Sequence, residues 1–312
     1  MAFFTRGAVA LSMVATLWGG GAVQAQDDGL TRLGIVQIFD NDWFGMPVGD
    51  RYDRWRTGAY QVSGFWGQDD WDGTLPYAPF DLIEFRFRGE IIAPDNLAAP
   101  AAGDRHYAPI LSFGAATHFD YRGLEVSAGA DLVLTGEQTG LMDVHDGIHR
   151  TFGGADVDLS DFMVEDGVYL NATLEGGRTF DWGNNQVRPF VEAQAGFENL
   201  VRVGADLRLG SYDPDSLLIR DATTGQRIVA VPGESVGGWS FTLGADAAYV
   251  ESSVLLPDTG PAHEDMRYRV RGGVGHGYGP ADFFYGVTYL SEEFEGQDEG
   301  QLVGTLSLML RF

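Results

Sequence analysis

Apolar and polar residues alternate along almost the whole chain after its N-terminal segment, and this period of two is typical of β-strands. The pattern is clearest in the last segment, QLVGTLSLMLRF, which covers residues 301–312 and ends on a phenylalanine. Similar segments recur along the chain and are separated by residues typical of turns. They predict twelve strands, approximately at Leu33–Asp40, Trp55–Trp66, Phe80–Ala93, His106–Thr117, Gly123–Leu134, Gly167–Thr179, Val187–Asn199, Leu200–Gly210, Trp239–Glu251, Arg267–His276, Ala281–Glu292 and Gln301–Phe312.

Segments of about ten alternating residues with turns between them are the pattern of a transmembrane β-barrel. An even number of strands also lets a bacterial barrel close without an open edge in the membrane. A soluble β-sandwich would show the same alternation, so alternation alone leaves both folds open. The terminal phenylalanine and the N-terminal segment favour the barrel. We therefore predict an all-β fold, a transmembrane antiparallel β-barrel of about twelve strands with a short extracellular helix.

The N-terminal segment, MAFFTRGAVALSMVATLWGGGAVQA, has the pattern of a secretory signal peptide. A single arginine precedes an apolar run from Ala8 to Leu17, and Val23 and Ala25 fit the small-x-small pattern before a cleavage site. A membrane anchor is the alternative, but the apolar run is too short to span a bilayer. We predict a signal peptide at residues 1–25, a barrel at residues 26–312 and localisation in the outer membrane of a Gram-negative cell.

Composition narrows the choice of function. The chain has 312 residues, no cysteine and a formal net charge of −25, and all 20 of its basic residues are arginine. Without cysteine, no disulfide framework can stabilise the exported protein. The strong negative charge argues against a nucleic-acid partner, because it repels phosphate. No later segment approaches the ~18 consecutive apolar residues of a transmembrane helix.

Loop lengths provide a check on the barrel, because short periplasmic turns should alternate with longer outer loops. The predicted short turns are residues 118–122, 180–186 and 277–280, and the predicted outer loops are residues 41–54, 94–105, 135–166 and 252–266. Residues 211–238 break the rule, because this long segment falls on the periplasmic side. Either this loop is unusual, or the strand count near Asn199 is wrong by one.

The longest outer loop contains a helical pattern, predicted at Thr139–Phe152. Thr139 or Asp143 can cap its start, and the glycine pair at residues 153–154 can end it. His145 and His149 are four residues apart and therefore lie on neighbouring turns. An apolar stripe at helical spacing accompanies them, formed by Leu141, Val144, Ile148 and Phe152.

Three polar groups should meet at one rim of the predicted barrel. Asp40-Asn41-Asp42 ends the first strand, residues 53–58 (DRWRTG) begin the second, and the predicted helix carries two histidines. Polar groups that converge from several strand ends form a plausible active site.

These stretches resemble a known family. IFDNDWF, followed by DRWRTG, resembles the N-D…D-R-x-x-T-x-G opening of the outer-membrane lipid A 3′-O-deacylases. GDRHYAPILSFG resembles their D-R-P-Y-A-G segment, and TGEQTGLMDVHDGIH resembles their G-P-x-x-x-G…Q-x-x-x-H segment. The ending YGVTYLSEEFEGQ…GTLSLMLRF resembles their last two strands. The four motifs occur in the family's order and span most of the mature chain.

The resemblance implies a twelve-stranded barrel that removes the 3′-acyloxyacyl group of lipid A and depends on calcium. Four positions match the family's functional residues, namely Asn41, Asp42, Thr57 and His149, and the family's helix glutamine falls on His145. The family also has a lysine after its third strand. This chain reads RFRGEIIAP there, so Arg88 is the candidate replacement, although a guanidinium fork differs from an ammonium group in geometry.

Such a reaction is chemically reasonable at this rim. Hydrolysis of an ester needs a water molecule, a base and a positive charge for the developing oxyanion. Imidazole exchanges a proton near neutral pH, so His149 suits the base. Calcium prefers oxygen ligands, and we predict Asp42, Asp156 and Glu165 as its ligands. The predicted partner is lipid A of the lipopolysaccharide in the outer leaflet, and we expect a monomer.

Two other functions stay open. His145-Asp-Gly-Ile-His149 is one methylene short of the zinc-hydrolase motif H-E-x-x-H, although Gly147 weakens a helix by ~1 kcal/mol. The chain would also fit a non-catalytic porin or structural barrel that keeps the shape without the activity, because a fold alone does not determine a function.

Overall fold

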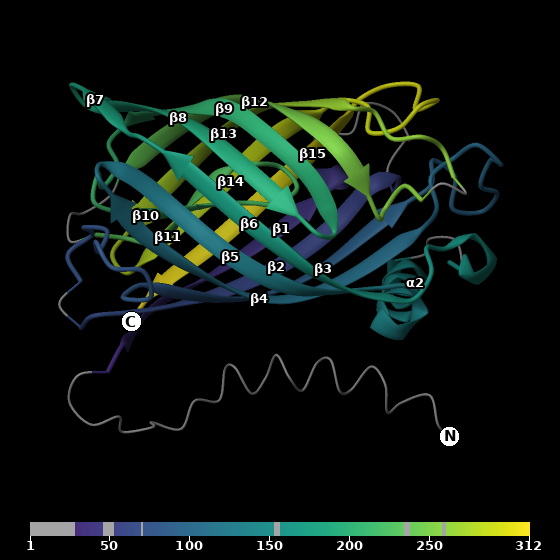
Figure 1. Ribbon diagram of the computed structural model, residues 1–312, viewed down its shortest axis with the longest axis horizontal. Coiled ribbons are helices and arrows are strands. Elements are labelled where there is room, and N and C mark those ends of the chain that lie inside the picture. The colour runs from purple at the N-terminus through teal and green to yellow at the C-terminus, as the bar shows by residue number, and fades with distance from the viewer. Residues whose placement is uncertain (1–28, 46–52, 70, 153–156, 234–237, 258–259) are drawn as a thin grey trace.

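The computed structural model describes residues 29–45, 53–69, 71–152, 157–233, 238–257 and 260–312. In this part of the chain, twelve long antiparallel strands form one closed barrel, because β6 pairs with β8 and joins the two ends of the sheet (Figure 1). The predicted signal peptide lies outside the described residues. The closed sheet confirms the barrel and rules out the soluble sandwich.

The barrel strands follow the chain in order around the wall. They are β1 (Thr31–Asn41), β2 (Trp55–Gly67), β3 (Ile83–Ala93), β4 (Ala108–Tyr121), β5 (Leu124–Thr135), β6 (Gly167–Gly177), β8 (Asn185–Ala195), β9 (Glu198–Gly210), β12 (Trp239–Ser253), β13 (Met266–Tyr278), β14 (Ala281–Leu290) and β15 (Gln301–Arg311). A short strand, β7 (Phe180–Trp182), extends the sheet beside β8.

Most predicted strands match the observed ones within a few residues. The largest differences are at the ends of β4, at Tyr121 rather than Thr117, and β8, at Ala195 rather than Asn199, and the next is at the start of β3. This strand begins at Ile83 rather than at Phe80. Phe80 has a positive φ of 73°, and its amide donates to the hydroxyl of Thr117 instead of joining the ladder. A backbone in the left-handed region cannot continue an extended strand, which explains the later start.

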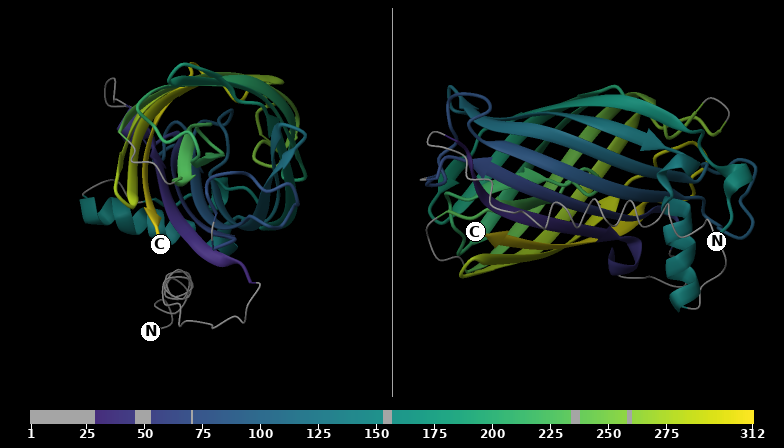
Figure 2. Two further views of the ribbon diagram at one scale, coloured as in Figure 1. Left: turned by 90° about the vertical axis from the view of Figure 1, so that its left-hand side faces the viewer. Right: turned by 90° about the horizontal axis from the view of Figure 1, so that it is seen from below.

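The long periplasmic segment at residues 211–238 is an unusual loop, and the strand count was right. It forms a hairpin of β10 (Leu217–Arg220) and β11 (Arg227–Val231) that folds back inside the barrel (Figure 2, left). The buried apolar side chains of the hairpin pack on inward-facing residues of β1, β2, β14 and β15. Burial of these side chains gives the hairpin a core of its own inside an otherwise polar lumen.

Alternation along the strands separates the two faces of the wall. On β6, Leu170 and Leu174 are exposed on the outer face, whereas Asn171 and Glu175 are buried on the inner face. The inward residues include many arginines, most of them with acidic partners. Arg271, for example, is bound to both Asp206 and Asp246. Apolar side chains outside and paired charges inside are the arrangement that a membrane barrel requires.

The helices lie outside the strand ladder. The 3₁₀ turn η2 (Glu137–Thr139) is followed by α2 (Leu141–Phe152), with Gly140 between them at a positive φ of 69°. Two further 3₁₀ turns are η1 (Asp42–Gly45) and η3 (Ser160–Phe162). The helix α2 contacts β3 and β4 at the barrel end opposite the C-terminus, here called the outer rim (Figures 1 and 2). None of the helices in the described residues is long and apolar enough to cross a bilayer.

Candidate active site at the outer rim

The first part of the site is the end of β1, where the chain turns onto the outer wall. Asp40 is directed into the lumen, where its carboxylate accepts a hydrogen bond from Thr305. The next residues form η1, which lies directly on β15. A side chain at Gly45 would come within 2.3 Å of the Leu302 carbonyl, and one at Gly304 would meet the backbone of Phe44. Glycine at both positions therefore lets the two backbones touch and fixes the start of η1.

Asp42 begins η1 and is almost completely buried. One of its oxygens, Oδ2, accepts a hydrogen bond from the Arg54 amide at 3.2 Å. The other, Oδ1, has no hydrogen-bond partner among the described residues. Burial, opposed by the hydrogen bond from the Arg54 amide and reinforced by the negative charge of Asp53, raises the pKa of Asp42 to about 7. A buried carboxyl group with an unpaired oxygen is a favourable position for a cation.

The second part is the distorted start of β2. Asp53 and Trp55 have positive φ angles of 61° and 50°, and the pairing with β3 shifts register between Trp55 and Gly58. Aspartate tolerates the left-handed region, but tryptophan rarely adopts it. Such strained backbones cluster at functional sites. Thr57 is buried within this irregular segment, and its hydroxyl donates to the Trp55 carbonyl at 3.4 Å.

The third part is α2, whose histidines face the barrel. His145 and His149 are 4% and 9% exposed, and their rings meet edge to face with centroids 4.5 Å apart. Val144 and Ile148, which belong to the predicted apolar stripe, are instead about half exposed. The helix therefore presents imidazoles to the wall and apolar side chains outward.

His145 is held by a residue that directly precedes β4. Its Nδ1 lies 3.0 Å from the hydroxyl of Tyr107, and the two rings are stacked. Burial and a charge on His149, opposed by Asp146, together lower the pKa of His145 to about 4. His145 is therefore neutral at neutral pH. Its Nε2 is buried without a hydrogen-bond partner among the described residues.

His149 meets the start of β2. Its Nε2 lies 3.6 Å from Oδ2 of Asp53. The same Asp53 is close enough to Asp42 for its charge to act on that carboxyl group. A continuous set of polar groups therefore runs from Asp42 through Asp53, His149 and His145 to Tyr107, although the five residues come from four separate segments.

The structure brings together most of the predicted site. Asn41 and Asp42 lie at the end of β1, and Asn41 pairs across the ladder with Gly58, the neighbour of Thr57. Sequence reasoning missed Asp53 and Tyr107 as site residues. Both lie inside the motifs DRWRTG and GDRHYAPILSFG, so the motifs contained a signal for them.

The predicted calcium ligands do not all lie together in the described structure. Asp156 lies outside the described residues. Glu165 is exposed just before β6, which is separated from β1 by four strands of the wall, and its backbone carbonyl accepts a hydrogen bond from Thr135. Of the predicted ligands, Asp42 has the feature that fits a hard cation, namely a buried oxygen that no described residue binds.

Arg88 does not replace the family's lysine at the rim. Its guanidinium lies in the lumen, where it contacts Asp221 at 3.1 Å and Thr223 at 2.5 Å on the loop between β10 and β11. Alternation directs the next residue, Gly89, to the outer face, where it lies under Leu141 of α2. Arg88 therefore holds the hairpin in place.

An aromatic surface adjoins the site on the outer wall. Phe39 and Phe44 are in ring contact at 5.6 Å, and Trp43 lies against Phe44 at 5.5 Å. Tyr60 extends this surface, and Tyr285 donates a hydrogen bond to the Phe44 carbonyl. Trp43 is 59% exposed, as expected for a side chain at a membrane interface.

Comparison with known proteins identifies the family. A profile described as "Outer membrane protein LpxR" matches residues 8–312. The chain belongs to the LpxR family. This is the lipid A 3′-O-deacylase family that the motifs resemble, and the result confirms the predicted family, fold and outer-membrane localisation. A search of curated proteins found no match.

Solved structures agree on the fold. LpxR from Salmonella typhimurium has a TM-score of 0.72 and 18% sequence identity, covering 89% of this chain and 100% of that chain. Similarity to the KdgM porin is much weaker, with a TM-score of 0.41 and 4% identity over 90% of this chain and 99% of that chain. Omp33 of Acinetobacter baumannii has a TM-score of 0.40 and 11% identity over 92% and 100% of the two chains. The last two values carry no argument about function.

Proposed function

We propose that this LpxR-family protein is an outer-membrane hydrolase that removes the ester-linked 3′-acyloxyacyl group from lipid A. The observation that carries the proposal is the pair of His149 and Asp53, which lies beside the buried carboxyl group of Asp42 at the outer rim. A base, an acidic partner and a cation position in one place are the groups that ester hydrolysis needs.

In the proposed mechanism, His149 takes a proton from a water molecule as that water attacks the ester carbonyl. Asp53, 3.6 Å from Nε2 of His149, stabilises the imidazolium that forms. His145 stays neutral, because burial lowers its pKa to about 4. It contacts His149 edge to face and limits the positions that the imidazole of His149 can adopt.

Calcium would supply the positive charge that stabilises the oxyanion. Asp42 would hold it through Oδ1, for which the described part of the chain offers no hydrogen-bond partner. Arg54, whose amide binds Asp42, does not compete for this role, because its guanidinium is bound to Asp95 and Glu299. Asn41 and Thr57 would shape the substrate's approach from the neighbouring backbone.

The position of the site fits a lipid substrate. The aromatic surface of Phe39, Trp43, Phe44 and Tyr60 adjoins it on the lipid-facing wall. Acyl chains in the outer leaflet can therefore reach the rim along an apolar path, and a monomer suffices for the reaction. The β10–β11 hairpin and its ion pairs occupy part of the lumen, which counts against an open porin.

Mass spectrometry of lipid A tests the proposal. Cells that express the protein should produce lipid A lighter by one acyloxyacyl group than cells with an empty vector. Cells that express the His149→Ala variant should match the empty vector. Unchanged lipid A in the presence of folded wild-type barrel and calcium would overturn the proposed activity.

A further inference from the structure

Asp53, His145 and His149 form a cluster that differs chemically from a calcium site. Each residue offers one ligand atom, and these atoms all lie within 4.8 Å of one another. Two imidazole nitrogens and one carboxylate oxygen are the ligands typical of zinc and related transition metals. Calcium prefers a shell of oxygens. The rim therefore holds two neighbouring groups with different metal preferences, Asp42 and this cluster.

The geometry of the cluster is close to that of a tetrahedral site. With metal–ligand bonds of about 2.0–2.1 Å, two ligand atoms on a tetrahedron are about 3.4 Å apart. Nε2 of His149 and Oδ2 of Asp53 are already 3.6 Å apart. The three ligand atoms already lie within 4.8 Å of one another. Small side-chain rotations would therefore bring the ligand atom of His145 to a tetrahedral distance from the other two.

A second observation points to a ligand at this position. His145 is only 4% exposed, yet its Nε2 has no hydrogen-bond partner among the described residues. Its other nitrogen, Nδ1, lies 3.0 Å from the hydroxyl of Tyr107. Metal-binding histidines use their second nitrogen in such a hydrogen bond, which orients the ring and leaves the first nitrogen for the metal.

We propose that Asp53, His145 and His149 bind a divalent transition metal of the zinc class, and that the bound ion inhibits deacylation. The inhibitory part rests on the proposed function, because it requires His149 to be the base. A metal on Nε2 of His149 leaves the ring proton on Nδ1, so neither nitrogen keeps a lone pair that could accept the proton of water. The same ion engages Asp53, which would otherwise stabilise the imidazolium.

This site depends on the position at which the chain departs from its family. The family pattern has glutamine where this chain has His145, and an amide is a poor zinc ligand compared with imidazole. With glutamine at position 145, two zinc ligands would remain. We therefore expect inhibition by zinc to be a property of this chain that the glutamine variant lacks.

Direct binding tests the site independently of activity. Purified barrel in detergent, stripped of metal, is titrated with zinc chloride in an isothermal titration calorimeter. We expect one zinc ion per chain, and an affinity at least about tenfold lower for His145→Gln. X-ray absorption at the zinc edge should detect two imidazole ligands in the wild type and one in the variant.

The matched control is His263→Gln. His263 lies in the outer loop between β12 and β13, with its Nδ1 3.7 Å from Asp265, and takes no part in the cluster. This variant should bind zinc as the wild type does. An absence of stoichiometric zinc binding, or equal weakening in both variants, would overturn the site.

Activity with calcium at saturation tests the inhibition. Each protein is compared with its own rate without zinc. Zinc should reduce the wild-type rate at least about tenfold when its site is filled, and should reduce the His145→Gln rate far less. Zinc binding without loss of rate would overturn the inhibitory role, and a rate that requires zinc would make the ion catalytic instead. A wild-type barrel that binds zinc but is inactive with calcium would overturn the proposed function while supporting the site.

Discussion

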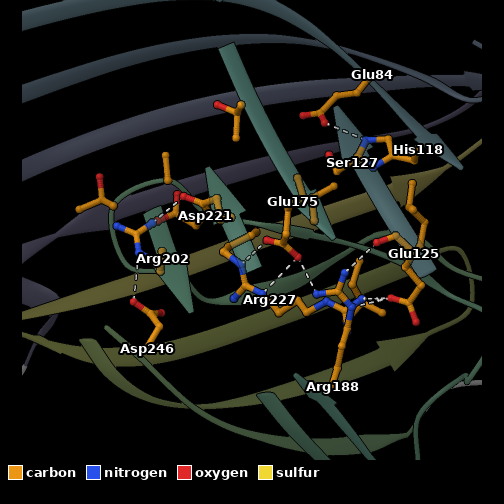
Figure 3. A pocket seen from close by; sticks show the side chains of 18 of the residues that line it. Glu84, His118, Glu125, Ser127, Glu175, Arg188, Arg202, Asp221, Arg227 and Asp246 are labelled. Carbon is orange, nitrogen blue, oxygen red and sulfur yellow. Dashed lines mark hydrogen bonds and ion pairs between the residues drawn. The ribbon is translucent and has the colours of Figure 1, made fainter. Parts of the chain in front are cut away.

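The lumen and the outer rim both bury charged and titratable groups, but the partners of these groups differ between the two regions. In the lumen, a cavity of about 940 Å3 is lined by arginines and carboxylates that form ion pairs with one another, such as Glu125 with Arg188 and Arg227 (Figure 3). At the rim, Asp42 and His145 are just as buried, but Asp42 is bound by a backbone amide and His145 lies against a tyrosine hydroxyl rather than an opposite charge.

The difference shows that burial of charge does not by itself mark an active site. In the lumen, paired buried charges of opposite sign orient the strands and the hairpin. At the rim, backbone amides and imidazoles replace the opposite charges, so the polar groups there keep free capacity to bind an ion or a proton. The following predictions test this contrast, from the largest expected effect to the smallest.

Removal of calcium should have the largest effect. A calcium chelator should abolish deacylation, and added calcium rather than zinc should restore it, because the oxyanion needs a hard cation near Asp42. The measurement is release of the acyl group from purified lipid A. Asp42→Asn should raise the calcium concentration needed for half-maximal rate. Glu165→Gln changes an exposed side chain and should leave this calcium concentration unchanged. An equal increase in both variants would mean that Glu165 is also a calcium ligand.

Removal of the proposed base, His149, should have the second-largest effect on the deacylation rate. His149→Ala should reduce the deacylation rate by at least ~10²-fold, because a general base typically contributes ~10²–10⁴. The barrel should still fold, since α2 lies outside the strand ladder, and heat-modifiable migration on a gel checks this. His263→Ala removes another outer-loop histidine and should keep the wild-type rate. Full activity in the His149→Ala variant would place the base elsewhere.

A change in the lumen should affect stability rather than chemistry. The carboxylate of Asp246 accepts hydrogen bonds from Arg269 and Arg271 and pairs with Arg202 at 3.2 Å. Asp246→Ala would leave three buried guanidinium groups without this partner, and we expect a loss of about 3–5 kcal/mol in the free energy of unfolding. Urea unfolding in lipid vesicles measures it. The folded fraction should deacylate lipid A at the wild-type rate. A large decrease in this rate would contradict the view that the lumen charges stabilise the barrel and the rim residues catalyse the reaction.

Asp161→Ala is the control for this stability measurement. Asp161 is exposed in the 3₁₀ turn η3, and its removal should change the free energy of unfolding by less than about 0.5 kcal/mol. Equal destabilisation by both substitutions would mean that loss of negative charge in general, rather than the buried contacts of Asp246, determines stability.

The smallest effect should come from His145→Gln when zinc is absent. His145 is neutral at neutral pH because burial lowers its pKa to about 4, so the uncharged amide should preserve the charge of the site. We expect a rate within a few fold of the wild type. His145→Gln with no activity, together with active His149→Ala, would reverse the two histidines' roles.

Much of the fold could be read from local pattern. The strands could be predicted from alternation because one side of every strand faces lipid and the other faces the lumen. Apolar and polar residues therefore alternate along each strand. The ordered motifs led to Asn41, Asp42, Thr57, His145 and His149, and the structure places them at one rim. The loop at residues 211–238 was visible as an exception, but its path was not.

The sequence by itself therefore determined the barrel, the position of the helix and most residues of the site. Only the tertiary structure decided that the hairpin enters the lumen, that Arg88 holds it there and that Asp53 and Tyr107 complete the histidine pair. These features depend on contacts between residues far apart in the chain and on backbone angles at Asp53 and Trp55 that no local pattern specifies. They form only when closure of the sheet brings the ends of separate strands to the same rim.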